Sequence, residues 1–261
     1  MKVTLIQNDV IWASPKENHE RLDRIFSEIP KSDLIVLPEM FSTGFVVRPE
    51  GVAEKLPNPV SLQWMKDRAS ALGSAIAGSV AVEENGQYYN RFYFVKPDSE
   101  VISYDKRHLF TFGGEDKTFT AGDKRVIVEW KGVRFLLLIC YDLRFPVWAR
   151  NRKDYDAIII VASWPKVRRY AWDTLLKARA IENQCYVLSV DRIGDDADGN
   201  HYNGGTFFID PLGKVLEEAV DTEDGAIYQS ITFDMDTKQL EEKFRPTFPV
   251  LNDADDFKIV L

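Results

Sequence analysis

Hydrophobic positions along this chain switch repeatedly between a period of two and a helical period. Residues 1–9 alternate as a short strand does, and Ser14-Pro15 then opens a helix by N-cap and first-turn preferences. That helix carries apolar side chains at helical spacing, at Leu22, Ile25, Phe26 and Ile29. Residues 34–37 read as a strand, 61–72 as an amphipathic helix and 74–82 as another strand. The pattern predicts a strand–helix–strand rhythm.

The middle of the chain predicts antiparallel pairing. Three strand-like runs, 75–82, 88–96 and 101–104, are separated by turn residues and are expected to form a meander. A further hairpin pairs residues 126–130 with 133–140 around a Lys-Gly turn.

The rest of the chain alternates buried strands with helices. Residues 156–163 are apolar without alternation, as expected of a strand that is covered on both faces. Further elements are expected as a helix at 170–183, strands at 185–190, within 204–213 and at 226–233, and a helix at 235–244. Strands covered on both faces, with helices between them, predict an α/β fold in which two sheets pack together between helices. We expect a four-layer α-β-β-α sandwich, formed as a single domain over residues 1–261.

Composition narrows the classes of function. A net charge of −8 and a pI near 5.1 oppose generic attraction to phosphate backbones or anionic lipid, so nucleic acid is not an expected partner. Apolar runs are far shorter than the roughly 20 residues of a membrane-spanning helix, and the first residues lack a signal-peptide pattern. Two cysteines, Cys140 and Cys185, show no disulfide spacing, which favours a reducing cytoplasm.

Motifs for cofactors and metals are missing. Neither a G-x-G-x-x-G nor a P-loop pattern is present. The histidines, His19, His108 and His201, are widely separated and lack the spacing of metal ligands, so a structural hydrogen-bonding role suits His108 better. We expect neither a cofactor nor a metal.

Three strand-like segments end in residues of complementary chemistry. Cys140 follows the apolar run 133–139, Glu39 ends a strand-like stretch, and Lys106 comes just after another. A helix from Phe145 would direct backbone N–H groups at the thiol, which favours both a thiolate and an oxyanion. Taken singly, these residues also fit a buried structural cysteine, a solvated acid and a lysine in an exposed turn. Together they supply the nucleophile, proton carrier and cation that amide hydrolysis needs.

The motifs around these residues resemble those of the nitrilase superfamily of carbon–nitrogen hydrolases. The matching stretches are Leu37-Pro38-Glu39, Asp105-Lys106-Arg107-His108-Leu109-Phe110 and Cys140-Tyr141-Asp142-Leu143-Arg144-Phe145-Pro146. They occur in the family's order, and the resemblance spans nearly the whole chain. It implies a nitrilase-type sandwich, a Glu-Lys-Cys triad and a homodimer.

The resemblance also implies a role for each residue of the triad. Glu39 would deprotonate Cys140, protonate the departing ammonia and then activate the water that opens the thioester. Lys106 and the backbone N–H of Tyr141 would stabilise the oxyanion. Glu115 is the counterpart of a second glutamate that supports the lysine, with a turn-forming surface acid as the alternative.

Two residues behind the thiol are interpreted as supporting ones. Asp142 and Arg144 either tune the pKa of the thiol or hold the turn as an internal ion pair.

The motifs also bear on the substrate. The Cys-Tyr-Asp stretch resembles amidases rather than true nitrilases, in which Cys-Trp-Glu is usual, and the chain is most similar to bacterial ω-amidases of 2-oxo acids. Those enzymes hydrolyse 2-oxoglutaramate and 2-oxosuccinamate to the oxo-diacid and ammonia. An N-carbamoyl or other small aliphatic amide hydrolase is the alternative enzyme. A non-catalytic dimeric interaction module is the alternative from another class, but its signature, a broken triad, is absent.

Candidate substrate-binding residues follow from this reading. A substrate carboxylate needs a basic partner, and Arg168 is the most plausible one. Trp164, after the strand at 156–163, is expected to wall the pocket, with core or dimer packing as an equal alternative. For Phe41 and Phe45 the same two alternatives apply, a wall of the pocket or packing in the core or a dimer interface.

Overall fold

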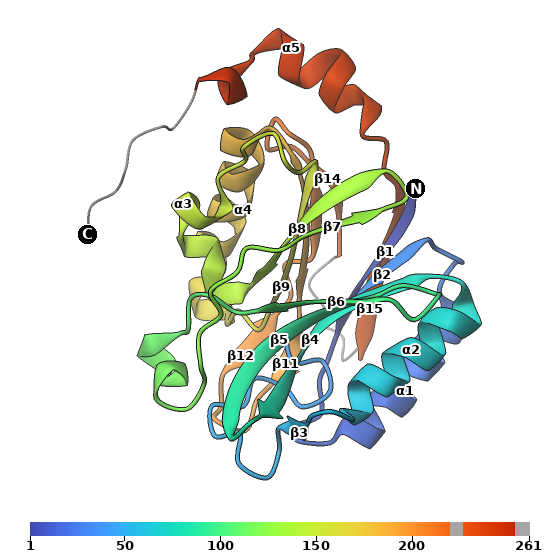
Figure 1. The fold of residues 1–261 in the computed structure, drawn as a ribbon, viewed down its shortest axis with the longest axis vertical. Helices are drawn as coiled ribbons and strands as arrows, with labels where there is room; N and C mark the ends of the chain where they lie inside the picture. Colours follow the sequence, from blue (N-terminus) through green and yellow to red (C-terminus); the bar gives the residue numbers. More distant parts are fainter. Residues whose placement is uncertain (220–226, 254–261) are drawn as a thin grey trace.

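Two β-sheets face each other in the computed structural model of the chain, which describes residues 1–219 and 227–253 (Figure 1). Along the first sheet the strands are β15 (Tyr228–Asp234), β1 (Lys2–Asn8), β2 (Leu34–Val36), β4 (Ala75–Glu84), β5 (Gln87–Val95) and β6 (Val101–Asp105), and β3 (Glu54–Lys55) pairs with β4. Along the second they are β14 (Val215–Glu218), β13 (Phe207–Ile209), β10 (Tyr186–Asp191), β9 (Ala157–Ala162), β8 (Val133–Ile139) and β7 (Ile127–Trp130).

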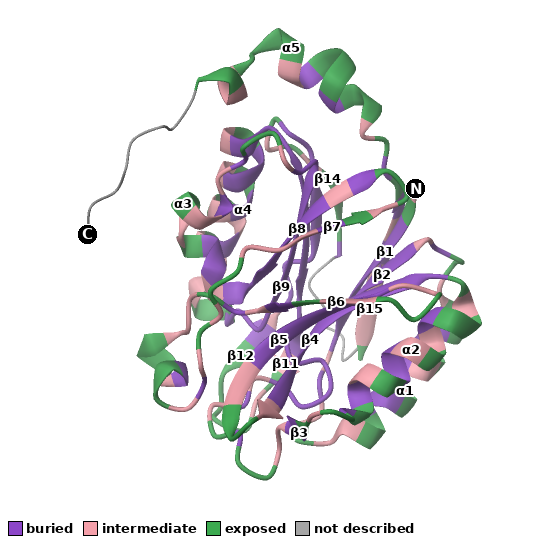
Figure 2. Ribbon diagram, viewed as in Figure 1, coloured by how far each residue is buried: buried purple, intermediate pink, exposed green. Residues whose placement is uncertain are grey.

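Helices cover the outer face of each sheet. The first sheet carries α1 (Pro15–Glu28) and α2 (Val60–Leu72), and the second carries α3 (Pro146–Ala149) and α4 (Arg169–Asn183) (Figure 1). Residues on the facing strands and on the inner sides of the helices are buried (Figure 2), and they form the hydrophobic clusters of the core. This is the predicted four-layer α-β-β-α sandwich, because each sheet has one face toward its partner and the other toward a helix layer.

The centre of the second sheet is a parallel trio. β9 lies between β8 and β10, with Ile159 in register with Leu137 on one side and Leu188 on the other. All six residues of β9 are buried, as the unbroken apolar run predicted. Parallel strands place their carboxyl ends at one edge of the sheet, so the residues that follow β8, β9 and β10 are neighbours there.

Most of the predicted elements agree with the structure to within one or two residues. The meander is β4, β5 and β6, and its first turn narrows to Asn85-Gly86, with φ values of 53° and 76°. Two successive left-handed residues give the backbone twist that a two-residue hairpin needs.

Other expectations need correction or extension. Part of the strand expected at 226–233 lies outside the described residues, and β15 begins at Tyr228. The helix expected at 235–244 begins later and runs through Leu240–Phe244 into α5 (Arg245–Thr247). Sequence patterns also missed the short hairpin of β11 (Ile193–Asp195) and β12 (His201–Asn203). Three-residue strands carry too few positions for periodicity to reveal them.

Among the helices in the described ranges, none has the length and apolarity that crossing a membrane requires.

The α1–α2 layer contains a buried histidine. The His19 ring stacks on Trp64 at 4.8 Å between centroids, and its Nε2 lies 2.9 Å from the Ser61 hydroxyl. Burial lowers the pKa of His19 to about 4, even though the charge of Asp23 opposes the shift. The neutral ring is therefore the form that the fold accommodates.

We predict that stability falls with acidification through this histidine. Its pKa is about 6.5 when unfolded, so the unfolded chain takes up a proton between about pH 6.5 and pH 4 while the folded chain does not. Between about pH 7 and pH 5 the resulting loss of unfolding free energy is about 2 kcal/mol. Urea unfolding of the wild type and His19→Gln should show a flatter pH dependence for the variant. Equal slopes would contradict the prediction.

Candidate active site

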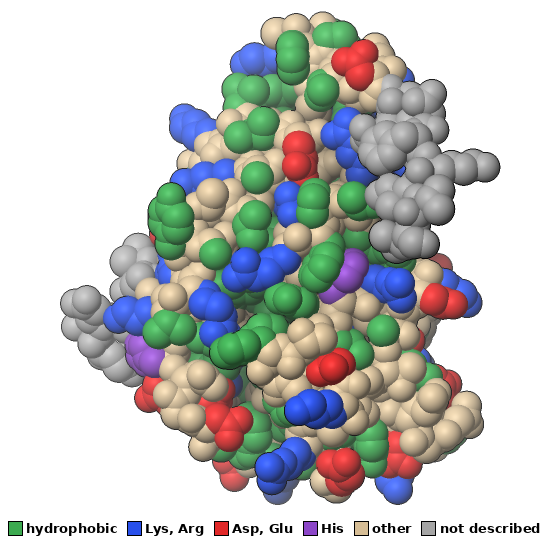
Figure 3. All heavy atoms as spheres, turned by 90° about the vertical axis from the view of Figure 1, so that its left-hand side faces the viewer, with side chains coloured by type: hydrophobic (Ala, Val, Ile, Leu, Met, Phe, Trp, Pro, Cys, Tyr) green, Lys and Arg blue, Asp and Glu red, His purple; other side chains and the backbone are tan. Residues whose placement is uncertain are grey.

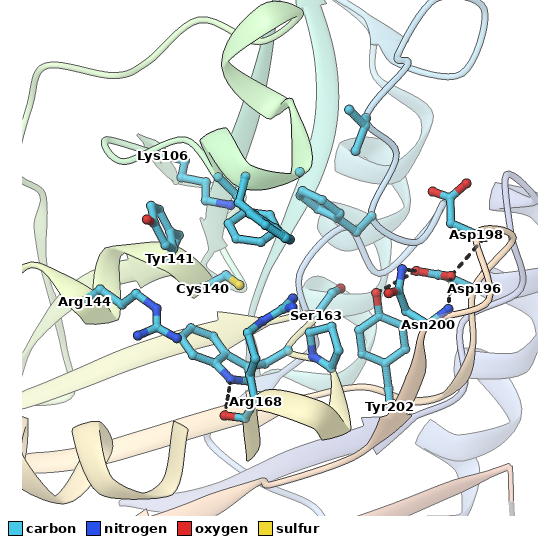
Figure 4. A pocket seen from close by; sticks show the side chains of 17 residues that line it. Lys106, Cys140, Tyr141, Arg144, Ser163, Arg168, Asp196, Asp198, Asn200 and Tyr202 are labelled. Carbon is cyan, nitrogen blue, oxygen red and sulfur yellow. Dashed lines mark hydrogen bonds between the residues drawn. The ribbon is translucent and has the colours of Figure 1, made fainter. Parts of the chain in front are cut away.

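A cavity of about 160 Å³ opens at the carboxyl edge of the second sheet. Its lining comes from the segments that follow β2, β6, β8 and β9 and from the β11–β12 hairpin (Figure 4). The lining includes Phe45, Lys106, Cys140, Tyr141, Arg144, Ser163, Trp164, Arg168, Asp196, Asn200 and Tyr202. The cavity is well below the roughly 300 Å³ at which pockets for drug-sized ligands begin, so its dimensions favour a small substrate.

Cys140 begins a tight turn at the end of β8. Its φ of 44° lies in the left-handed region, which a residue with a Cβ adopts only at a cost. The turn, a 3₁₀ helix over Cys140–Arg144, is held by two side chains: Asp142 accepts the Ile139 N–H at 3.0 Å, and Arg179 donates to the Leu143 carbonyl at 2.5 Å. Hydrogen bonds that do not involve the thiol therefore hold the strained conformation, and the thiol faces the cavity.

Glu39 lies behind the cavity and is fully buried. One carboxylate oxygen accepts hydrogen bonds from Lys106 Nζ at 2.9 Å and Asn90 Nδ2 at 2.7 Å. The other accepts the backbone N–H of Ser163 at 2.8 Å. Elements of both sheets thus meet at this carboxylate, since Glu39 follows β2 and Ser163 follows β9. The solvated-acid interpretation is wrong for this residue.

Lys106 joins two carboxylates. Its ammonium lies 2.9 Å from Glu39 and 2.9 Å from Glu115, and none of the three side chains is exposed. Burial lowers the pKa of Lys106, but the charges of Glu115 and Glu39 outweigh burial and raise it overall. The lysine therefore stays protonated. Glu115 also accepts the Phe110 N–H at 2.6 Å, so it holds the loop after β6 and is not a surface acid.

The thiol does not exist as a ready thiolate. Burial, followed by the charge of Glu39, raises the pKa of Cys140 well above its usual value, and Lys106 offsets this only in part. The expectation of a helix-stabilised thiolate is wrong, because only a short turn and the four-residue α3 follow Cys140. A neutral thiol needs a base to attack a carbonyl carbon.

Asp142 organises the loop that carries Lys106. It accepts hydrogen bonds from Tyr104 Oη at 2.7 Å and from the His108 backbone N–H at 2.9 Å, and the His108 ring lies 2.8 Å away. This agrees with the structural role expected of His108. The guanidinium of Arg144 instead lies 4.8 Å above the Trp164 ring, so the turn is not held by an Asp142–Arg144 pair.

The substrate-binding candidates separate into two groups. Trp164 and Arg168 line the cavity, and the Arg168 guanidinium points toward the same space as the Cys140 thiol (Figure 4). Phe41 does not line it: its ring is fully buried and lies 5.7 Å from Trp64 under the α1–α2 layer. Phe45, further along the same loop, lines the cavity in its place.

Sequence reasoning missed two parts of the site and the cavity-lining position of a third residue. Asn90 bridges Glu39 and Glu115, and its only signal was an amide among the aromatic residues of β5. Arg144, interpreted from the sequence only as a residue that supports the thiol, also lines the cavity. The β11–β12 hairpin closes the far side with Asp196, Asn200 and Tyr202 (Figure 4). Short strands and loop side chains gave no periodic pattern to find them.

Comparison with known proteins places this geometry in a family. The family model described as carbon-nitrogen hydrolase matches residues 2–238. Omega-amidase YafV of Yersinia enterocolitica is 40% identical over 260 residues, covering 100% of this chain and 99% of that protein. A 2-oxoglutaramate amidase of Bacillus subtilis is 34% identical over 256 residues, covering 96% of each.

A solved structure agrees with these relatives. A CN-hydrolase superfamily protein from Xanthomonas campestris, which carries an arsenic adduct in its active site, superposes with a TM-score of 0.93 at 39% identity. The match covers 100% of this chain and 99% of that one. The chain belongs to the carbon–nitrogen hydrolase family.

Proposed function

We propose that this protein is an amidase that hydrolyses the terminal amide of a small 2-oxo dicarboxylic acid monoamide, such as 2-oxoglutaramate or 2-oxosuccinamate, to the acid and ammonia. It is a hydrolase of linear amides, in keeping with its family and with full-length relatives named omega-amidase and 2-oxoglutaramate amidase. The observation that carries the proposal is a thiol beside a buried Glu39–Lys106–Glu115 cluster, in a small cavity that also holds two arginines.

Acylation begins with Glu39 as the base. The Cys140 sulfur attacks the amide carbon while its proton passes to Glu39, which avoids a free thiolate that this site disfavours. The carbonyl oxygen becomes negative and is stabilised by the Lys106 ammonium and the Tyr141 N–H. Because the pKa of Lys106 is raised, it acts as a fixed positive charge rather than as a proton donor. Glu39 then protonates the departing nitrogen, leaving a thioester and ammonia.

Deacylation uses the same carboxylate. Glu39 takes a proton from water, which attacks the thioester carbon, and the proton returns to sulfur as the acid leaves. Glu115 contributes by holding Lys106 and the Phe110 N–H throughout. Two carboxylates around one ammonium thus keep the cation in place while the proton of Glu39 comes and goes.

The cavity suits a substrate with a carboxylate beyond its amide. Arg168 and Arg144 are basic side chains of the lining, and the Arg168 guanidinium lies 5.2 Å from the Phe110 ring centroid. A guanidinium can donate two parallel hydrogen bonds to a carboxylate, which fixes both its position and its orientation. Phe45 and Trp164 supply the walls in this proposal.

The substrate class is tested by steady-state ammonia release from 2-oxosuccinamate, glutamine, a carbamoyl amino acid, a simple aliphatic amide and a nitrile. We expect 2-oxosuccinamate to have the highest kcat/KM. If simple aliphatic amides turned over equally fast, the 2-oxo acid assignment would have to be abandoned. A carbamoyl substrate at the top of the ranking would favour the alternative hydrolase.

The nucleophile can be tested against a matched cysteine. Cys140→Ala should abolish turnover and leave Tm nearly unchanged, because the turn is held by Asp142 and Arg179 rather than by the sulfur. Cys185→Ala, at a fully buried position under no catalytic demand, should retain kcat within about threefold while losing stability by about 1 kcal/mol. Residual turnover in the Cys140 variant would remove it from the mechanism.

The carboxylate partner can be tested in the same assay. Arg168→Gln should lower kcat/KM for 2-oxosuccinamate by about 10- to 100-fold, since charged hydrogen bonds are worth about 1.5–3 kcal/mol. Turnover of a neutral aliphatic amide should change little. Arg24→Gln, on exposed α1 surface, is the control. Equal losses on both substrates would argue against recognition of the carboxylate.

We also propose that residues 1–261 form one domain that pairs as a homodimer in the cytoplasm. Hydrophobic side chains gather on the face that carries α3 and α4 (Figure 3). Exposed members of those helices are Val147, Tyr170 and Ile181, which a second copy would cover. Sedimentation of protein from the soluble cell fraction should give twice the 29.9 kDa chain mass. A monomer would contradict the pairing.

A further inference from the structure

A third side chain lies at the edge of the second sheet, where the strands that precede Cys140 and Ser163 end. Asp191 ends β10, in register with Ala162 of β9, and β9 pairs with β8 on its other side. Its carboxyl group is fully buried and does not line the cavity. The proposed mechanism makes no use of this group.

One oxygen of Asp191 accepts hydrogen bonds from the backbone next to the catalytic carboxylate, that of Glu39. Oδ1 accepts the Trp164 N–H at 2.9 Å and the Arg192 N–H at 2.8 Å. The preceding N–H, that of Ser163, donates to Glu39 at 2.8 Å. Asp191 and Glu39 therefore hold two successive N–H groups of one turn, and the position of Glu39 depends on where Asp191 holds that turn.

The other oxygen has no such support. Oδ2 is buried and has no hydrogen-bond partner among the residues that the structure describes. The Arg192 guanidinium, its neighbour in sequence, donates instead to Asp9 and to the carbonyls of Val10 and Asp195. A buried carboxylate with one unpaired oxygen is costly, whereas the acid form removes the charge.

The environment of Asp191 also favours its neutral form. Burial raises the pKa of Asp191 well above its usual value; the Trp164 and Arg192 N–H groups and the charge of Arg169 oppose this, and Glu39 reinforces it. The titratable and charged groups that face Asp191 from the neighbouring elements are Glu39, Cys140, Arg169, Arg192 and Tyr202. An ionised Asp191 would add negative charge where the thiol must lose its proton.

We propose that Asp191 is a positioning residue of the active site, which fixes the Ser163–Trp164 turn and through it Glu39, and that it does so as a neutral carboxylic acid. This inference rests on the proposed amidase function only for its turnover measurement. The acid needs a single acceptor oxygen for the turn and carries its proton on the other one.

The neutral state is tested with Asp191→Asn, which keeps the acceptor oxygen and cannot ionise. Iodoacetamide labelling of Cys140, followed against pH by peptide mass spectrometry, needs no amide substrate. We expect the pH midpoint of labelling to stay within about 0.3 units of wild type and kcat to stay within about threefold. A midpoint lower by half a unit or more would show that wild-type Asp191 carries a charge, and would overturn the neutral assignment.

The positioning role is tested with Asp191→Ala, which removes the acceptor for the Trp164 N–H. With 2-oxosuccinamate we expect kcat to fall at least tenfold while KM changes less than threefold, and Asp191→Asn to restore kcat. Wild-type turnover in the alanine variant would refute the role. If the alanine variant does not fold, the asparagine variant decides alone: wild-type kcat supports positioning by a neutral group, and a tenfold loss opposes it. An inactive wild type would count against the amidase assignment and leave the labelling comparison standing.

Discussion

The buried ammonium of Lys106, held between Glu39 and Glu115, is the interaction on which the rest of the site depends. A charge with no exposure to water survives only when opposite charges and hydrogen bonds replace its hydration. Lys106 has two carboxylates for this purpose, and Asn90 donates to both of them. Removing the Lys106 charge would leave two buried carboxylates uncompensated, so both depend on this one cation.

The fold forms this site by bringing together the ends of strands that belong to different sheets. Glu39 follows a strand of the first sheet and Cys140 a strand of the second, and the two sheets are packed face to face. The backbone N–H of Ser163 crosses this boundary to reach Glu39. The packing of the sandwich therefore sets how far apart Glu39 and Cys140 lie, and the loops have only to orient the two side chains.

The shifted pKa values determine the protonation state of each group in the site. The raised pKa of Lys106 makes it a permanent cation, and the raised pKa of Cys140 keeps the thiol protonated until a base takes the proton. These shifts have one origin, because burial strengthens every charge interaction in the site and disfavours every unpaired charge. The cavity differs from the cluster, because arginines, aromatic rings and hairpin residues line it; in the proposed function these residues select the substrate.

The sequence by itself determined the helices, the strands and the type of chemistry, because all of these depend on local patterns of residues. Alternation, helical spacing and the unbroken apolar run of β9 predicted the layers, and the motifs around Glu39, Lys106 and Cys140 indicated the reaction. Tertiary structure alone decided which neighbours each residue meets. It placed Phe41 in the core and Phe45 in the cavity. Asp142 hydrogen-bonds with Tyr104 and His108 rather than with Arg144. Asn90 and Asp191 were also brought to the site. Those contacts join residues far apart in the chain, and a one-dimensional pattern carries no information on which strand ends a folded sandwich will set side by side.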